Sequence, residues 1–132
     1  ILFLFIICIC ISTDIGGYAF GKLFKGPKLT KYSPNKTFSG MIGSFVFSFF
    51  SMYIFTNIFL IDESLLKLFL FTTLISLISQ LGDIIVSYFK RLSKIKDTGK
   101  IIPGHGGLLD RIDGMIFVFP FSNIIIFANF FQ

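Results

Sequence analysis

The sequence predicts an all-α integral membrane protein, and three observations support this fold class. Hydrophobic residues make up 54% of the 132 residues, and only 14% are charged, whereas about a quarter are charged in a typical soluble domain. The apolar residues gather in runs of the length that membrane helices need. The polar residues gather between these runs, chiefly in residues 87–113. We therefore expect about four transmembrane helices.

The first two elements follow from where the charges fall. Residues 1–15 are expected to be part of a transmembrane helix, because the thirteen uncharged residues before Asp14 are fewer than the roughly 20 that cross a bilayer. We interpret the start at Ile1 as a truncation within that helix, since no basic region and cleavage site indicate a signal peptide. Residues 16–37 are rich in glycine and contain five lysines, which predicts a connecting loop.

Three further spans follow. Residues 38–61 carry no charge and are long enough to cross a bilayer. Small residues recur there at a spacing of three to four, which favours close packing against another helix; they are Gly40, Gly43, Ser44, Ser48 and Ser51. A short acidic turn leads into residues 65–89, the next span. Residues 115–131 form the last and shortest span, which contains Pro120.

The two basic loops, residues 16–37 and 90–113, indicate the orientation. Loops rich in lysine and arginine face the cytoplasm, so we expect a multi-pass protein of the inner (cytoplasmic) membrane with its active site facing the cytoplasm. The formal net charge of +5 is then better matched to anionic lipids and phosphorylated substrates than to nucleic acid.

Three carboxylates are candidate metal ligands. Asp83 lies inside a predicted span, where an ionisable side chain is costly and usually functional; a carboxylate that reaches the interface, or a structural pair with Lys90, is the alternative. Asp110 and Asp113 lie where the last span begins, and there helix capping is the alternative. If these side chains converge, their oxygens suit Mg²⁺, and a second cation stays open.

The loop between them has the composition of a phosphate site. Glycines around His105 permit backbone N–H groups to approach a phosphate, although the same segment is also a plausible turn. His105 itself is more often a hydrogen-bonded structural residue than a catalytic one. The adjacent pair Lys96 and Asp97 could place a cation on a phosphate while the carboxylate orients it. The remaining basic residues would otherwise only fix the topology; they are Lys90, Arg91, Lys94 and Lys100.

These residues resemble the signature of the phosphatidate cytidylyltransferases, or CDP-diacylglycerol synthases. The matching positions are Ser87, Lys90-Arg91, Lys96-Asp97, Gly99, Ile102-Pro103, His105-Gly106-Gly107 and Asp110-Arg111-Ile112-Asp113. Upstream, the family pattern is matched by Asp14-Ile15-Gly16-Gly17-Tyr18, Gly21, Ser33-Pro34-Asn35-Lys36-Thr37 and Gly40. One position departs from it: Ser39 stands where a glutamate is expected, so the role of that glutamate is moved or lost here.

The resemblance implies the C-terminal catalytic part of a larger polytopic enzyme. Such an enzyme transfers a cytidylyl group from CTP to phosphatidic acid, gives CDP-diacylglycerol and pyrophosphate, and requires Mg²⁺. The resemblance assigns the metal centre to Asp83 and Asp110. It implies catalytic roles for Lys96, Asp97, His105, Arg111 and Asp113, and substrate binding by Lys36, Ser33, Lys90, Arg91, Gly104, Gly106 and Gly107. The expected partners are CTP, phosphatidic acid and membrane lipids, and a homodimer stays open.

Two alternatives remain at this stage. No residue reads cytosine directly, so a related lipid-phosphate nucleotidyltransferase or phosphotransferase could use another lipid or nucleotide. The second alternative is a cation transporter or channel subunit in which Asp83 and Asp110 bind a permeating ion. Five lysines in one loop and a glycine-rich phosphate segment argue against it, because a cation pathway needs neither.

Overall fold

The structure, a computed structural model, describes residues 1–31, 36–94 and 109–127, with the backbone alone for residues 109–113 and 127. These residues form four α-helices: α1 (Leu2–Phe24), α2 (Phe38–Phe59), α3 (Leu65–Leu92) and α4 (Leu109–Phe127). The first three are long and apolar enough to cross a membrane, and the apolar part of α4 is shorter. The predicted all-α membrane fold is therefore confirmed, with three full-length spans and a shorter fourth helix.

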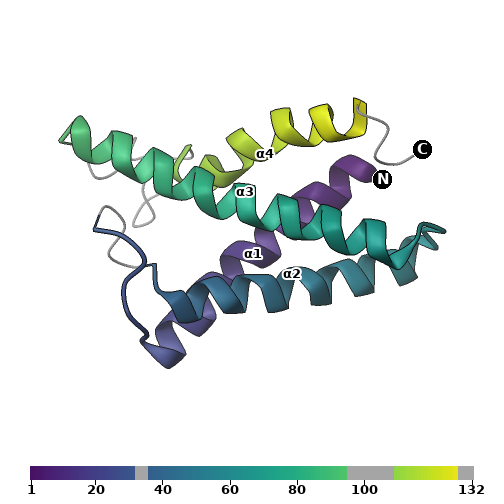
Figure 1. Ribbon diagram of the computed structural model, residues 1–132, viewed down its shortest axis with the longest axis horizontal. Helices are drawn as coiled ribbons and strands as arrows, with labels where there is room; N and C mark the ends of the chain where they lie inside the picture. Colours follow the sequence, from purple (N-terminus) through teal and green to yellow (C-terminus); the bar gives the residue numbers. More distant parts are fainter. Residues whose placement is uncertain (32–35, 95–108, 128–132) are drawn as a thin grey trace.

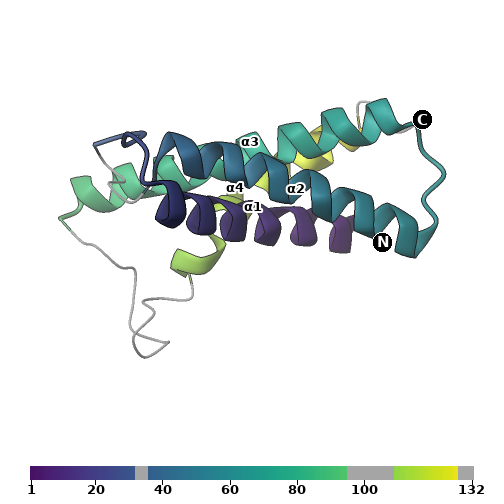
Figure 2. The same cartoon turned by 90° about the horizontal axis from the view of Figure 1, so that it is seen from below.

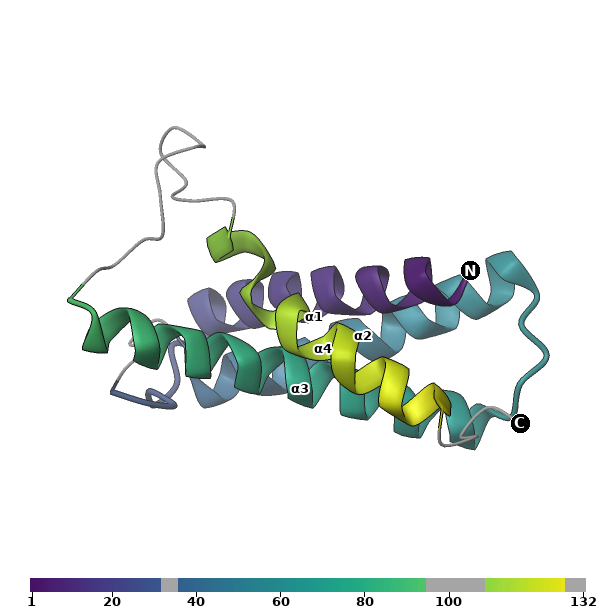
Figure 3. The same ribbon diagram turned by 90° about the horizontal axis from the view of Figure 1, so that it is seen from above.

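The helices pack in two pairs. Figure 2 shows α1 and α2 side by side, and Figure 3 shows α4 lying along α3. The connection between α1 and α2 lies at the same end of the molecule as the end of α3, whereas the turn between α2 and α3 lies at the opposite end (Figure 1). We call the first of these the basic end, because it carries the lysines of residues 22–36 together with Lys90 and Arg91.

The first helix continues well beyond its expected end. Residues 1–15 were expected to complete the span and residues 16–37 to form a loop, but α1 runs to Phe24. Its glycines lie against α2 and do not break the helix: the backbone of Gly16 meets that of Gly43, and a Cβ on Gly40 would lie 2.7 Å from the carbonyl oxygen of Gly17. Close backbone approach between membrane helices requires such residues, so the predicted small-residue stripe on α2 is confirmed.

The boundaries of α3 and α4 also differ from those expected, because the helices continue through charged residues that were expected to lie in loops. Helix α3 runs to Leu92, so Lys90 and Arg91 belong to its last turn and not to the expected loop of residues 90–113. Helix α4 begins at Leu109, so Asp110 and Asp113 lie in its first turns. Both placements are favourable, because the helix dipole attracts cations at the C-terminus and anions at the N-terminus.

The interior changes from apolar to polar along the bundle. Towards the end opposite the basic end, the core contains Phe5, Ile9, Phe71, Ile75 and Val118, all fully buried. Towards the basic end the buried side chains carry hydroxyl groups; they are Thr13, Ser44, Ser76 and Ser79. Buried polar groups in an apolar environment need hydrogen-bond partners, and this polar layer lies directly below the candidate site.

Candidate functional site

A cavity of about 350 Å³ opens at the basic end, between α1, α2, α3 and the connection that joins α1 to α2. Its wall carries the carboxylates of Asp14 and Asp83, the ammonium group of Lys36, and the polar side chains of Gln80 and Ser87. The other lining residues are Thr13, Gly17, Tyr18, Leu29, Thr37, Gly40, Met41 and Ser44. A concave site of this size with a few convergent polar groups is the usual form of a small-molecule site.

Hydrogen bonds between three helices form the floor of this cavity. The hydroxyl of Ser44 on α2 donates to the carbonyl oxygen of Thr13 on α1 at 2.7 Å. The hydroxyl of Thr13 lies 3.3 Å from that of Ser76 on α3, which also accepts from Nε2 of Gln80 at 3.3 Å. The polar floor therefore couples α1, α2 and α3 at the depth where the cavity ends.

Asp83 and Lys36 form an ion pair across the cavity. Nζ of Lys36 donates to Oδ2 of Asp83 at 2.7 Å, and the two side chains are 29% and 22% exposed. The sequence suggested Lys90 as a structural partner of Asp83, whereas the structure pairs it with a lysine from the other basic segment. A carboxylate held inside a membrane helix needs such compensation, because an unpaired charge in an apolar environment is strongly unfavourable.

The connection between α1 and α2 places Lys36 over the cavity. Its two arms run antiparallel: the N–H of Leu29 donates to the carbonyl oxygen of Lys36 at 2.8 Å, and the N–H of Phe38 donates to that of Pro27 at 3.1 Å. The next residue, Thr37, caps α2 through its side-chain hydroxyl. The backbone of Lys36 is thus fixed at the start of α2, and its side chain reaches across to α3.

Ser39, the residue that replaces the expected glutamate, lies in the first turn of α2, next to this connection. Its hydroxyl lies 2.9 Å from that of Thr37 and accepts from the N–H of Gly26 at 3.4 Å. Serine at this position therefore joins the beginning of the connection to the first turn of α2. The side chain does not line the cavity.

The start of α4 lies against the turn of α3 that carries Asp83. A Cβ built on Gly114 would lie 2.9 Å from Oδ1 of Asp83 and 2.5 Å from Oγ of Ser79. One oxygen of Asp83 thus contacts Lys36, and the other faces the backbone of α4. Asp110 precedes Gly114 by one helical turn, which places the two residues on the same face of α4.

Ser79 brings a buried hydroxyl group to this contact. The residue is 1% exposed, and its Oγ makes no hydrogen bond to a nitrogen or oxygen atom of the described residues; the thiol of Cys10, a weak hydrogen-bonding group, lies within its reach. It lies one turn before Asp83 on α3, on the same face. A hydroxyl group beside a carboxylate can donate to it or accept from a group that binds there, so Ser79 adds one oxygen to the surroundings of Asp83.

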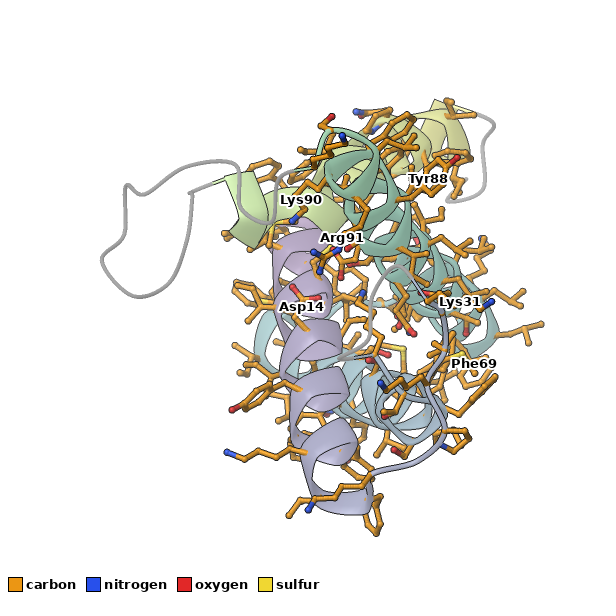
Figure 4. The ribbon with its side chains drawn as sticks, turned by 90° about the vertical axis from the view of Figure 1, so that its left-hand side faces the viewer. Asp14, Lys31, Phe69, Tyr88, Lys90 and Arg91 are labelled. Carbon is orange, nitrogen blue, oxygen red and sulfur yellow. The ribbon has the colours of Figure 1, made fainter. Side chains whose placement is uncertain are left out.

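The structure brings some of the expected site residues together, whereas others lie outside its described part. Asp83 and Lys36 meet at the cavity, and Lys90 and Arg91 lie at the basic end, which Figure 4 views directly. The expected residues that fall outside the described part of the chain are Ser33, Lys96, Asp97, Gly104, His105, Gly106 and Gly107. For Asp110, Arg111 and Asp113 the backbone alone is described. Their roles stay predictions.

Asp14 is a cavity residue that sequence reasoning missed. It was interpreted as the end of a span, but α1 continues for more than two turns beyond it, and Asp14 lines the cavity. Figure 4 labels Asp14 on α1, viewed from the basic end. The argument that singled out Asp83, namely that a carboxylate within a membrane helix is usually functional, applies equally to Asp14. The glycines that follow Asp14 concealed this, because they suggested a loop.

Comparison with known proteins gives a family match over nearly the whole chain. The family model described as the cytidylyltransferase family matches residues 1–129. The phosphatidate cytidylyltransferase of Staphylococcus haemolyticus is 44% identical over 117 residues, which cover 86% of this chain and 44% of that protein. The phosphatidate cytidylyltransferase of Bacillus subtilis is 41% identical over 121 residues, 90% of this chain and 45% of that protein.

A third relative, the phosphatidate cytidylyltransferase of Staphylococcus epidermidis, is 41% identical over 124 residues, which cover 93% of this chain and 48% of that protein. The chain thus spans a little under half the length of these curated relatives. The family match, by contrast, covers nearly every residue, including all four helices and every residue that lines the cavity. The chain belongs to the cytidylyltransferase family.

Proposed function

We propose that the protein to which this chain belongs transfers the cytidylyl group of CTP to phosphatidic acid, forming CDP-diacylglycerol and pyrophosphate in phospholipid synthesis. The names of its relatives support this activity. The observation that carries it is the ion pair of Lys36 with Asp83 at the wall of a cavity that opens at the basic end. A cation and a carboxylate side by side at such an opening suit a reaction between two phosphorylated substrates.

The chemistry requires positioning and charge neutralisation more than acid–base catalysis. An oxygen of the phosphatidate phosphate attacks the α-phosphorus of CTP, and the bond to the β-phosphate oxygen breaks as pyrophosphate leaves. The attacking phosphate is already ionised near neutral pH, so the chain need not supply a base. Two anions must instead be held together, as in phosphoryl transfer generally. Lys36 at the cavity, with Lys90 and Arg91 at the same end, supplies positive charge for this.

The residues at the cavity fit a hard divalent cation, for which we propose Mg²⁺. Asp83 already holds a cationic group, and the buried hydroxyl of Ser79 lies one turn away. Among the described residues, no three aspartate, glutamate, histidine or cysteine side chains lie close enough together to hold a metal ion. Further ligands would therefore come from Asp110 or from substrate phosphates and water, as is usual for Mg²⁺. Bound there, Mg²⁺ would neutralise phosphate charge; whether a second cation joins it stays open.

The location follows from the same arrangement. Helices that span the membrane surround a cavity that opens at the basic end, and basic segments face the cytoplasm. We therefore propose an active site on the cytoplasmic side, which a soluble nucleotide reaches from water and a lipid reaches from the bilayer. Membrane lipids are accordingly its neighbours.

A labelled-nucleotide assay tests this function. The full-length protein, purified in detergent with phosphatidic acid, should transfer radiolabel from α-labelled CTP into chloroform-extractable lipid in the presence of Mg²⁺. ATP, GTP and UTP serve as nucleotide controls, and lysophosphatidic acid and polyprenyl phosphate serve as lipid controls. Efficient labelling from another nucleotide or lipid would instead favour the related transferase considered above.

Two isosteric variants test the metal assignment in the same assay. Asp83→Asn and Asp110→Asn should abolish Mg²⁺-dependent labelling while membrane insertion and elution volume stay as in the wild type. Activity retained in either variant would refute its role as a ligand. Cation flux through reconstituted vesicles, without lipid labelling, would support the transporter alternative.

A further inference from the structure

We propose that Lys36 and the divalent cation are alternative partners of Asp83, so that Lys36 holds the carboxylate between turnovers and moves to a substrate phosphate when the cation binds. This inference rests on the proposed function and concerns the order of events at the same site. It assigns Lys36 two successive partners, where the sequence implied only a substrate contact.

The argument begins with the distance. Nζ of Lys36 lies 2.7 Å from Oδ2 of Asp83, which is direct contact between full charges. A divalent cation bound to the same carboxylate would be within a few ångströms of the ammonium group, and like charges at that separation repel strongly where water is partly excluded. Both side chains are less than one-third exposed, so solvent screens this repulsion only in part. The two cations therefore cannot share Asp83 at full strength.

The second step concerns where the ammonium group goes. The backbone of Lys36 is held by the hydrogen bond from Leu29 and by the start of α2, so the side chain must move while the main chain stays. An ammonium group left at this depth without an anion would be destabilised. Lys36 lines the cavity, and a phosphate group that enters the cavity provides the anion. Cation binding and phosphate binding are therefore coupled, and each should strengthen the other.

The coupling has a mechanistic consequence. In the absence of a phosphate ligand, Lys36 competes with the divalent cation, so the cation alone should bind weakly. When phosphate and cation arrive together, the ammonium group and the carboxylate each exchange one partner for another. The site would thus be completed only when substrate is present, and Lys36 is the residue that imposes this condition.

Binding of Mn²⁺, measured by electron paramagnetic resonance on the full-length protein without nucleotide, tests the competition. Lys36→Met keeps the apolar stem of the side chain and removes its charge, and it should tighten Mn²⁺ binding by roughly tenfold or more. Lys28→Met is the matched control, because Lys28 belongs to the same connection and its side chain is exposed; its Mn²⁺ affinity should match the wild type. Lys36→Arg retains the charge and should also bind Mn²⁺ weakly.

Sulfate, a phosphate-like anion, tests the second half of the exchange. Sulfate should tighten Mn²⁺ binding to the wild type, compared with chloride at equal ionic strength, and should not do so in Lys36→Met. An unchanged or weakened Mn²⁺ affinity in Lys36→Met would overturn the proposal, as would a wild type that does not respond to sulfate. Neither measurement uses CTP or phosphatidic acid, so the competition can fail in an active cytidylyltransferase and can hold in a protein with another activity.

Discussion

Replacing Gly114 by alanine tests whether α4 is held against Asp83 by close backbone packing. The new Cβ would lie 2.5 Å from Oγ of Ser79 and 2.9 Å from both the carbonyl oxygen of Ser79 and Oδ1 of Asp83. A side chain can turn away, but the carbonyl oxygen belongs to the backbone of α3 and cannot. The helix must therefore shift outwards, and α4 carries Asp110 one turn before Gly114.

The expected size of the effect follows from two opposing terms. Overpacking of a well-packed contact costs about 1–3 kcal/mol, and alanine in place of glycine inside a helix returns about 1 kcal/mol. Since a fixed backbone atom is among the three contacts, the cost lies in the upper half of its range. We expect Gly114→Ala to lower the free energy of unfolding by about 1–2 kcal/mol and to weaken Mn²⁺ binding at Asp83.

The measurement is reversible unfolding of the full-length protein in detergent, together with Mn²⁺ binding. Gly21→Ala is the milder comparison, because its Cβ would lie 3.2 Å from the hydroxyl of Thr37 and 3.8 Å from Cα of Gly40; it should lower stability less than Gly114→Ala does. The double variant Ser79→Ala/Gly114→Ala should recover part of the loss, since one of the three contacts is removed. Wild-type stability and Mn²⁺ affinity in Gly114→Ala would refute the packing argument.

Three further variants address the other contacts. Gly43→Ala should lower the unfolding free energy by about 1–3 kcal/mol, because its Cβ would overlap the side chain of Phe20 and lie 2.7 Å from the carbonyl oxygen of Gly16; Ser51→Ala on the same helix is the control, and equal stability of the two would contradict the reasoning. Asp14→Asn should reduce lipid labelling by roughly 10- to 100-fold with unchanged elution volume, and full activity would show that its carboxylate only lines the cavity. Thr37→Ala removes the cap of α2 and should lower the unfolding free energy by about 1 kcal/mol; Thr73→Ala, whose hydroxyl donates to the carbonyl oxygen of Phe69 within its own helix, should change it less.

The sequence was sufficient to predict the fold class, because hydropathy determines which segments are buried in the bilayer. Asp83 could also be predicted, since a carboxylate within an apolar run is rarely accidental. The ion pair with Lys36 could not be predicted. Lys36 is distant in sequence, and its reach depends on how the arms of the α1–α2 connection pair, through hydrogen bonds between backbone groups that carry no residue-specific pattern.

Glycine was the main source of error in the helix boundaries. A segment with several glycines is typical of a loop. Here, however, the glycines form the surface on which α1 meets α2; they are Gly16, Gly17 and Gly21. In water, glycine destabilises a helix because of its low helix propensity. In a membrane, the close helix packing that glycine permits compensates for this cost. A sequence alone does not say which partner helix would supply that gain, so Asp14 was placed at the end of the span and not within it.

The carboxylate of Asp83 contacts two distant parts of the chain, one through each oxygen, and so makes them depend on one another. Its two oxygens face the α1–α2 connection and α4, respectively, so a change that displaces either neighbour alters the orientation available to the other. Substitutions near residue 36 and near residue 114 should accordingly compensate each other among homologues, because both positions adjoin Asp83. Grafting one of these segments from a relative, without the other, would therefore give a misaligned carboxylate, and exchanging both together would preserve it.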